Sequence, residues 1–250
     1  MAVIEEQEAR EAIVEIGRRL HERGLISGID GNISIRLSKS RVLVTPSGVN
    51  KGYLRPSDLL IVDIEDGSKV KGKGKPTSEI RMHLEAYRLR SDIGAVVHAH
   101  PPTAVALSVA GVSLSQCFIA EDLLQYGIVP TAPYATPGSE DVPRALARYI
   151  VDHEAVMLER HGSVTVGRTV YEAYNRLESL EHTAKITFMA LQLGNPKPLP
   201  DREVERLIEL AESMGVKTGW QNLAKRAEDT SEEDRFLAEV LVRVLKKLGY

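Results

Sequence analysis

Cysteine and aromatic residues are scarce in this sequence of 250 residues. Cys117 is the single cysteine, and only 5% of the residues are aromatic. One cysteine excludes an internal disulfide framework and fits a reducing compartment, so we expect a cytoplasmic protein. The first residues, MAVIEEQEAR, lack the basic-then-apolar order of a signal peptide. Since no apolar run approaches the roughly 20 residues of a membrane span, we expect no membrane insertion.

An excess of charge of either sign is also missing. The net charge is -3, with 27% charged and 43% hydrophobic residues, which is typical of a globular protein. This balance gives no basic surface for nucleic acid. No G-x-G-x-x-G follows a predicted strand, and GKGKP (72–76) lacks the helix of a phosphate loop. An anionic substrate would therefore have to be held by local groups.

Hydrophobic periodicity predicts the order of helices and strands. Strand patterns cover residues 32–37, 41–46, 59–64, 69–73, 93–100, 127–135 and 155–167. Helical patterns cover residues 4–23, 77–90, 102–110, 139–150 and 169–193, with two more helices after 200. This order indicates an α/β or α+β domain with a mainly antiparallel sheet. We expect one domain over residues 1–195 and a helical extension over 196–250, packed on the same domain or on a neighbouring subunit.

Two histidines stand one residue apart in AVVHAHPPTA (95–104), at the end of an apolar segment. Residues i and i+2 of a strand point to the same face, so His98 and His100 can converge on one metal ion. Such a short motif is also found as an ordinary polar pair at a strand end. Pro101 or Pro102 fits the first turn of the helix that follows. These residues alone leave both interpretations open.

Two further residues favour a metal site. His161 ends a second apolar segment before Gly162, a residue that would let the backbone turn sharply. Glu79 begins a predicted helix, with Thr77 or Ser78 as the N-cap. A carboxylate there is stabilised by the helix dipole, but it can also project into a cleft. Three neutral imidazoles with an exchangeable fourth position make a catalytic zinc site.

The remaining histidines are interpreted as structural. His83 follows Glu79 by four residues on the same helix face, a spacing unlike the H-E-x-x-H of metalloproteases. We interpret His83 as a packing residue or as a contact behind the site. His21, His153 and His182 lie in amphipathic helices or at helix ends.

Small polar residues at predicted strand and helix ends suggest an anion site. GIDGNISI (28–35) precedes one strand, VTPSGVNK (44–51) follows another, and PTSE (76–79) opens a helix. Backbone N–H groups and hydroxyls at such places can bind an anion, although the same residues also form plain turns. The candidates are Gly31, Asn32, Ser47, Gly48, Thr77 and Ser78.

Taken in order, several segments resemble the class II aldolase/adducin family over about residues 5–195. They are DGNISIR, TPSGV, KPTSE, VVHAHPPTAVALS, APYATPGS and LERHGSVTVG. The resemblance implies a three-layer α/β/α fold with a central, mainly antiparallel sheet, assembled as a homotetramer with active sites near subunit interfaces. It implies zinc (or manganese, iron or cobalt) held by His98, His100 and His161. Glu79 would be the catalytic carboxylate, and a fourth ligand in the resting state.

The resemblance also implies a reaction. The family's aldolases cleave a ketose 1-phosphate, such as L-fuculose 1-phosphate, to dihydroxyacetone phosphate and an aldehyde through a zinc-stabilised enediolate. The substrate phosphate would lie among the six anion-site candidates. Glu79 favours an aldolase over the family's sugar-phosphate epimerases, which usually carry aspartate at this position. The alternatives are decarboxylation, 4-epimerisation or dehydration at the same metal, or an adducin-like interaction module without catalysis.

Three features depart from the aldolase pattern. Cys117 stands where the catalytic tyrosine would align, and Ile29 replaces a threonine of the first phosphate loop. The chain after residue 200 is longer than expected, with Tyr250 as a candidate for the C-terminal tyrosine that reaches a neighbouring site. These departures concern the aldehyde half of the substrate more than the metal chemistry, so the aldehyde and the stereochemistry are left open.

Overall fold

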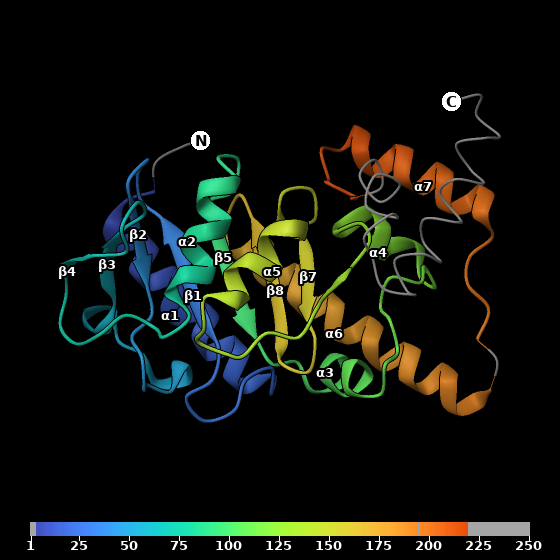
Figure 1. Ribbon diagram of the computed structural model, residues 1–250, viewed down its shortest axis with the longest axis horizontal. Helices are drawn as coiled ribbons and strands as arrows, with labels where there is room; N and C mark the ends of the chain where they lie inside the picture. The colour runs from blue at the N-terminus through green and yellow to red at the C-terminus, as the bar shows by residue number, and fades with distance from the viewer. Residues whose placement is uncertain (1–3, 195, 220–250) are drawn as a thin grey trace.

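An eight-stranded sheet runs through the middle of the protein (Figure 1). The computed structural model describes residues 4–194 and 196–219. The strand order is β4-β3-β2-β1-β5-β8-β7-β6, and all neighbours are antiparallel except the parallel pair β6–β7. The strands are β1 (Asn32–Arg36), β2 (Arg41–Val44), β3 (Leu60–Asp63), β4 (Lys69–Lys71), β5 (Ala95–Ala99), β6 (Thr131–Ala132), β7 (Ala155–Leu158) and β8 (Gly162–Gly167). The prediction of a mainly antiparallel sheet is confirmed.

Helices cover both faces of the sheet. One face carries α1 (Glu6–Glu22) and α6 (Val170–Leu193), and the other carries α2 (Ile80–Leu89) and α5 (Asp141–Ile150). Val97 of β5 belongs to the core beneath α1 and α6, whereas Val96 belongs to the core beneath α2 and α5. Successive strand residues point to opposite faces, so the buried strands feed two cores. The result is the predicted three-layer α/β/α fold.

The other α-helices of the described residues pack at the β7 side of the molecule. They are α3 (Pro102–Val109), α4 (Ala120–Gln125) and α7 (Asp201–Ser213). Val204 and Ile208 of α7 pack against Leu123 of α4 and against Ile128. The described part of the C-terminal extension therefore packs on its own chain. The second predicted helix of the extension and Tyr250 lie outside the described residues, and the division of the chain at residue 195 stays a prediction.

The segment 155–167 differs from its prediction as one strand. It forms the hairpin β7–β8, in which Leu158 pairs with Gly162. The turn residue with left-handed backbone is Arg160, with φ 56°, and Gly162 is not among the positive-φ glycines. The predicted strand over 127–135 is reduced to β6, and α4 was not predicted because six residues give too short a helical period.

The start of α2 also differs from its prediction. The helix begins at Ile80, and Glu79 is its N-cap residue without a side-chain capping bond. Thr77 accepts a hydrogen bond from the Glu79 N–H through Oγ1 at 3.3 Å, so it closes a turn before the helix instead of capping it. This turn fixes the Glu79 backbone at the start of α2, beside the ends of β1 and β5.

The register gathers several segments at one end of the sheet. His98 of β5 lies opposite Asn32 of β1 on one side and opposite Val164 of β8 on the other. Beside them, Pro46 and Pro76 form an isolated antiparallel bridge between the loop after β2 and the loop before α2. Residues far apart in the sequence therefore meet where β1, β5 and β8 end.

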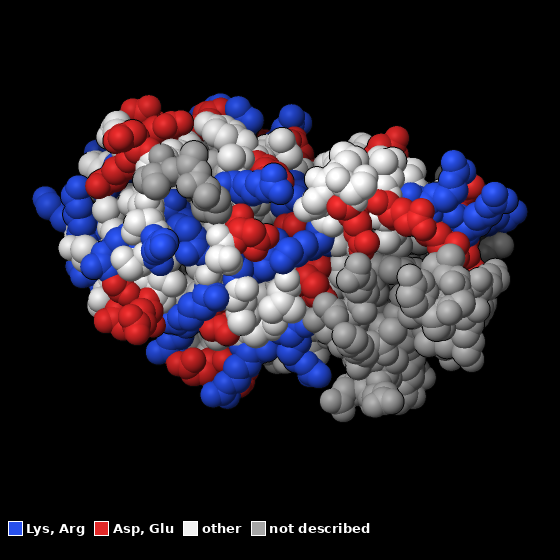
Figure 2. Space-filling view, turned by 90° about the horizontal axis from the view of Figure 1, so that it is seen from above, with Lys and Arg blue, Asp and Glu red and all other residues white. Residues whose placement is uncertain are grey.

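Charged side chains of both signs are interleaved over the described part of the face in Figure 2. Surface ion pairs include Arg81 with Glu140, between α2 and the start of α5, and Arg88 with Glu85 at 3.3 Å. Pairs this exposed stabilise a fold by about 1 kcal/mol at most. None of the described helices has the length and apolarity needed to cross a membrane.

Candidate metal centre and active site

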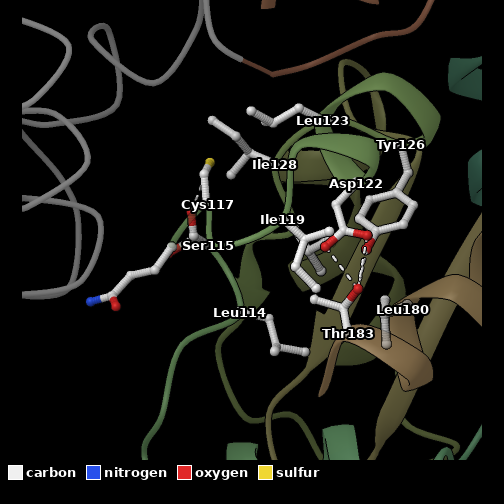
Figure 3. Close-up of a pocket in the computed structure, with 13 residues that line it drawn as sticks. Leu114, Ser115, Cys117, Ile119, Asp122, Leu123, Tyr126, Ile128, Leu180 and Thr183 are labelled. Atoms are coloured by element: carbon white, nitrogen blue, oxygen red, sulfur yellow. Dashed lines mark hydrogen bonds between the residues drawn. The ribbon is translucent and has the colours of Figure 1, made fainter. Parts of the chain in front are cut away.

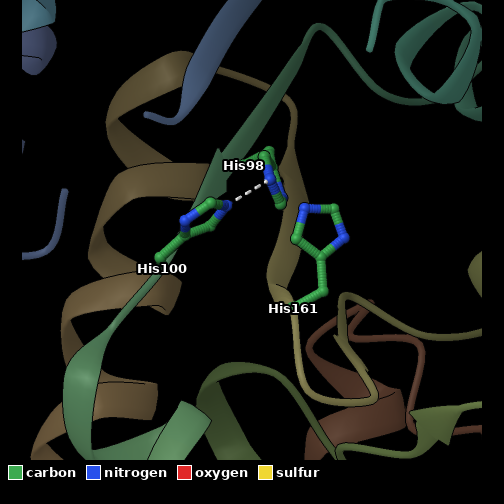
Figure 4. A group of neighbouring side chains, drawn as sticks. All are labelled: His98, His100 and His161. Atoms are coloured by element: carbon green, nitrogen blue, oxygen red, sulfur yellow. Dashed lines mark hydrogen bonds between the residues drawn. The ribbon is translucent and has the colours of Figure 1, made fainter. Parts of the chain in front are cut away.

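Three imidazole rings converge at this end of the sheet (Figure 4). His98 belongs to β5, His100 follows it directly, and His161 lies in the β7–β8 turn. Their ligand nitrogens all lie within 4.8 Å of one another, and Nε2 of His98 is 3.1 Å from Nε2 of His100. Two nitrogens bound at 2.0–2.1 Å to a tetrahedral ion would be about 3.3 Å apart. The group can therefore hold a metal ion.

Backbone contacts fix the imidazoles. His98 Nδ1 donates to the Ser163 carbonyl at 2.9 Å, because a carbonyl can only accept, and this leaves Nε2 free for a metal. The His100 backbone N–H donates to the Leu25 carbonyl at 3.1 Å. A Cβ on Gly162 would lie 2.7 Å from Cδ2 of His100 and 2.4 Å from the Ala99 carbonyl oxygen. Gly162 therefore lets the hairpin approach the histidines closely, instead of providing the turn predicted from the sequence.

The carboxylate of Glu79 lies against these rings. Oε2 is 3.2 Å from Nε2 of His98 and accepts a 2.8 Å hydrogen bond from the Asn32 amide, while Oε1 is 3.2 Å from Nε2 of His161. The Glu79 side chain is only 13% exposed, and Oε1 is buried without a hydrogen-bond partner among the described residues. A buried carboxylate oxygen without a donor is unfavourable unless a cation compensates it. The carboxylate and the three imidazoles thus fit a divalent metal.

The protonation states at the site suit a cation. Burial raises the pKa of the Glu79 carboxyl, but the field of His98, the close ring nitrogens of His161 and His98, and the Asn32 hydrogen bond hold that pKa well below its usual range. Burial, with repulsion from His98 and His161, lowers the pKa of His100 to about 4, and Asp30 and Glu79 offset only part of this. At neutral pH the site therefore presents an ionised carboxylate and a neutral His100, as metal binding requires.

Two of the predicted anion loops lie side by side. The bridge between Pro46 and Pro76 joins them, and the backbone N–H groups of Ser47 and Thr77 donate to Lys75 and Thr45 carbonyls at 3.0 and 3.1 Å. These two N–H groups are therefore occupied by the protein itself. The exposed hydroxyls of Ser47 and Ser78, the Thr77 hydroxyl and the backbone of Gly48 are the groups that these loops offer to an anion.

The third predicted loop, residues 28–35, contacts the Glu79 carboxylate. Gly31 has φ 70°, and a Cβ there would lie 2.6 Å from Ile26 Cγ2, so only glycine fits. The Asn32 side chain donates to Glu79 through Nδ2 and meets Nε2 of His83 through Oδ1 at 2.5 Å. Its amide is thus held at both ends, which leaves only the second Nδ2 proton for an anion.

Three further residues near the site were not predicted from the sequence, although the spacing of two of them gave a weak indication. Ser34 follows Asn32 by two residues on one strand face, and Tyr87 follows Glu79 by eight residues on one helix face, so their spacing could have identified them. Lys51 carried no such signal. It is buried against α1, its Nζ donates to the Ile29 carbonyl at 2.6 Å, and burial lowers its pKa despite nearby Asp30 and Glu79.

Cys117 lies between α4 and α7 and lines a small pocket with Asp122 and Thr183 (Figure 3). Burial raises the pKa of its thiol to about 12, and the Asp122 carboxylate adds to the effect. None of the described contacts of Cys117 involves the three clustered histidines. Within the described residues, the thiol thus lies in the pocket beside α4 and not among the three histidines.

The other histidines lie apart from the cluster, as the sequence predicted. The ring of His21 packs against Tyr53 with centroids 5.4 Å apart, and His153 is buried with Nδ1 2.9 Å from the Tyr149 carbonyl oxygen. His182 lines a surface groove along α6. His83 lies behind Glu79, in contact with Asn32 and Ser34.

Comparison with known proteins identifies the family. Residues 11–188 match the model of the Class II Aldolase and Adducin N-terminal domain. The chain is 34% identical to the 5-deoxy-D-ribulose 1-phosphate aldolase of Bacillus thuringiensis serovar kurstaki (84% of this chain, 98% of that protein). It is 36% identical to the 3-oxo-tetronate 4-phosphate decarboxylase of Escherichia coli K12 (74% and 88%). A solved L-fuculose 1-phosphate aldolase superposes with a TM-score of 0.77 at 31% identity (85% and 100%). The chain belongs to the class II aldolase/adducin family.

Proposed function

We propose that this chain is a metal-dependent aldolase that cleaves a ketose 1-phosphate to dihydroxyacetone phosphate and an aldehyde. The observation that carries the proposal is the Glu79 carboxylate, buried between His98 and His161 with Oε1 lacking a donor. A similar aldolase of 5-deoxy-D-ribulose 1-phosphate and a similar structure of an L-fuculose 1-phosphate aldolase support the substrate class. L-Fuculose 1-phosphate and 5-deoxy-D-ribulose 1-phosphate are therefore the first substrates to test.

The donor set suits zinc. His98, His100 and His161 would hold the ion, with Glu79 as a fourth ligand in the resting state. Manganese, iron and cobalt accept the same ligands. When bound, such an ion acts as a Lewis acid that polarises a substrate carbonyl and stabilises developing negative charge by several kcal/mol.

Glu79 would move the proton. In condensation, its carboxylate takes a proton from the carbon of dihydroxyacetone phosphate that becomes nucleophilic, and in cleavage it returns that proton. A positioned base of this kind contributes roughly 10²–10⁴-fold to the rate. The low pKa of Glu79 keeps the carboxylate ionised for this task, and displacement from the ion by substrate would raise its basicity.

The substrate phosphate would lie beside Glu79. Ser47 and Gly48 on one loop and Thr77 and Ser78 on the next would contribute hydroxyls and backbone groups. Gly31 and Asn32 would close the other side, where Asn32 already contacts the carboxylate. In this proposal the anion would lie near the base without an excess of positive charge.

The chain would act as a homotetramer. Several apolar side chains on the last turns of α6 are exposed: Phe188, Met189 and Leu193, the last of them 89% exposed. Exposed apolar patches often mark protein interfaces. Light scattering would give the mass in solution, and a monomeric mass at micromolar concentration would contradict this assembly.

Decarboxylation is the second candidate function. The 3-oxo-tetronate 4-phosphate decarboxylase of Escherichia coli K12 is as similar to this chain as the aldolase is. Cys117, at the position where an aldolase tyrosine would align, is half-buried between α4 and α7. Both chemistries leave negative charge beside a polarised carbonyl, so the same ligands serve either.

A substrate panel at a fixed zinc concentration separates the candidates. We expect cleavage of ketose 1-phosphates by the wild type, with Glu79→Gln lowering the rate by roughly 10²–10⁴-fold while zinc stays bound. Release of CO₂ from an oxo-tetronate phosphate, without turnover of any ketose 1-phosphate, would overturn the aldolase proposal. Less than about one metal ion per chain together with no turnover would favour a non-catalytic, adducin-like module.

A further inference from the structure

A row of buried polar side chains leads from Glu79 into the layer between β1 and α2. Its members are Asn32, Ser34, His83 and Tyr87, each at most 2% exposed. His83 lies 2.5 Å from the Asn32 amide oxygen through Nε2 and 2.7 Å from the Ser34 hydroxyl through Nδ1. The Ser34 hydroxyl also lies 2.9 Å from the Tyr87 hydroxyl. The row thus consists of consecutive hydrogen bonds that end on the carboxylate.

The direction of every bond follows from the first. The Glu79 carboxylate only accepts, so the Asn32 amide donates to it through Nδ2 and leaves Oδ1 as an acceptor. His83 must then donate through Nε2 and accept from the Ser34 hydroxyl through Nδ1. Ser34, having used its proton, accepts from the Tyr87 hydroxyl. One tautomer of His83, with the proton on Nε2, satisfies the whole row.

The spacing of these residues in the sequence explains why they form a row. Glu79, His83 and Tyr87 are four residues apart along one face of α2, and Asn32 and Ser34 are two apart on one face of β1. Burial, reinforced by His98, lowers the pKa of His83 to about 3, and Glu79 only partly opposes this. His83 is therefore neutral at physiological pH and offers one donor and one acceptor.

We propose that His83, supported by Ser34 and Tyr87, is a positioning residue that fixes the Asn32 amide and thereby the orientation of the Glu79 carboxylate. The proposal rests on the proposed role of Glu79 as the proton-transferring group. Without the His83 donor, Oδ1 of the Asn32 amide loses the partner that fixes it, so the amide can turn away from the carboxylate towards other donors. The carboxylate would then lose its fixed orientation beside His98 and His161.

The tautomer gives a direct test that needs no substrate. Nitrogen-15 NMR of the zinc-loaded protein, with His83 assigned by comparison with His83→Gln, should show a neutral ring protonated on Nε2. Ser34→Ala removes the donor to Nδ1, and we expect the His83 signals to shift in that variant. A ring protonated on Nδ1, or signals unmoved by Ser34→Ala, would overturn the proposal.

Kinetics give the second test, with L-fuculose 1-phosphate or the ketose 1-phosphate that the substrate panel selects. For His83→Leu we expect kcat to fall by about 10- to 100-fold, the size of effect seen for groups that orient site residues. KM should change less than threefold, and the zinc content should not change. His83→Gln keeps a donor and an acceptor, so it should recover part of the loss, and Tyr87→Phe should lower kcat only a few-fold.

His153→Leu is the matched control, because it also removes a fully buried imidazole but lies apart from Glu79. It should lower stability without changing kcat per folded molecule. In a Glu79→Gln background, His83→Leu should cost no further activity, since the two residues act on one step. Full activity of Glu79→Gln would refute the proposed function, whereas an inactive Glu79→Gln with an unimpaired His83→Leu would refute only the positioning role.

Discussion

The two ends of strands β5, β7 and β8 each bury a glutamate, and the two carboxylates are treated differently. Glu154, before β7, is 4% exposed and binds Arg176 at 2.9 Å and Arg90 at 3.2 Å. The Lys217 backbone N–H adds a third donor at 3.3 Å. Glu79, at the opposite end, has one amide donor and the Nε2 atoms of two histidines as neighbours, and its Oε1 has no hydrogen-bond partner among the described residues.

The difference separates a structural charge from a functional one. Glu154 is neutralised by cations that belong to the fold, so it joins β7 to α6 and to the segment after α7. Glu79 has an amide and two imidazoles beside it but no arginine or lysine in hydrogen-bond contact among the described residues, so its buried charge favours a cation from outside the chain. The variants below test that contrast.

The largest expected effect on stability comes from the structural end. Glu154→Gln leaves Arg90 and Arg176 without their shared carboxylate, so we expect the free energy of unfolding to fall by about 3–5 kcal/mol in urea denaturation. Glu172→Gln removes the more exposed partner of Arg176 and should cost less than about 1 kcal/mol. If Glu154→Gln lowered the free energy of unfolding only slightly, or Glu172→Gln lowered it strongly, Glu154 would not be the structural charge described here.

Zinc should stabilise the protein by binding at the three-histidine cluster beside Glu79. At a free zinc concentration of 100 times Kd, the free energy of unfolding should rise by about 2.7 kcal/mol. His100→Ala should abolish this gain and His182→Ala should preserve it, measured by thermal melting with and without a chelator. If zinc raised the free energy of unfolding equally in both variants, the ion would not bind at the three-histidine cluster.

The metal-free protein should lose stability in acid. The pKa values of His83 and His100, about 3 and about 4, lie below the roughly 6.5 of an unfolded histidine. Between about pH 4 and pH 6.5 the unfolded chain therefore binds more protons, and stability falls as the pH falls. The slope should reach about 1.4 kcal/mol per pH unit for each histidine. In His83→Gln the free energy of unfolding should depend less steeply on pH. An unchanged dependence would contradict the low pKa of His83.

A third buried glutamate gives the smallest expected effect. Glu181 of α6 is 2% exposed and accepts from the backbone N–H groups of Thr103 and Ala104 at 3.0–3.1 Å, at the start of α3. These donors are neutral, and the one cation near Glu181 among the described residues, Lys185 at 3.7 Å, is exposed, so Glu181→Gln should cost only about 1 kcal/mol of unfolding free energy. Glu178→Gln, on the exposed side of the same helix, is the control and should be near neutral.

The sequence predicted the parts of the fold that depend on local periodicity. The alternation in NISIR placed β1, the apolar run in AVVHA placed β5, and helical spacing placed α1, α5 and α6. The parallel pairing of β6 with β7 could not be predicted, because β6 has only two residues and its partner is set by packing. Arg160, instead of Gly162, adopts the left-handed turn conformation, which no composition rule favours.

At the site, residue types were easier to predict than contacts. The histidines and Glu79 stood out by their positions at segment ends, and the structure brings them together. The two hydrogen bonds of the Asn32 amide are to Glu79 and His83, which lie 47 and 51 residues further along the chain. Contacts over such separations depend on how β1 and α2 pack, so the same asparagine was predicted only as an anion-binding residue.

X-ray absorption spectroscopy of the full chain, loaded with one equivalent of zinc, tests the central claim most directly. We expect imidazole scattering from three ligands, with nitrogen and oxygen neighbours at about 2.0–2.1 Å and no sulfur. His98→Ala should remove this signature, because His98 is the buried member of the cluster. A zinc–sulfur distance near 2.3 Å, which would indicate Cys117, or a shell of oxygen ligands without imidazole would contradict the account.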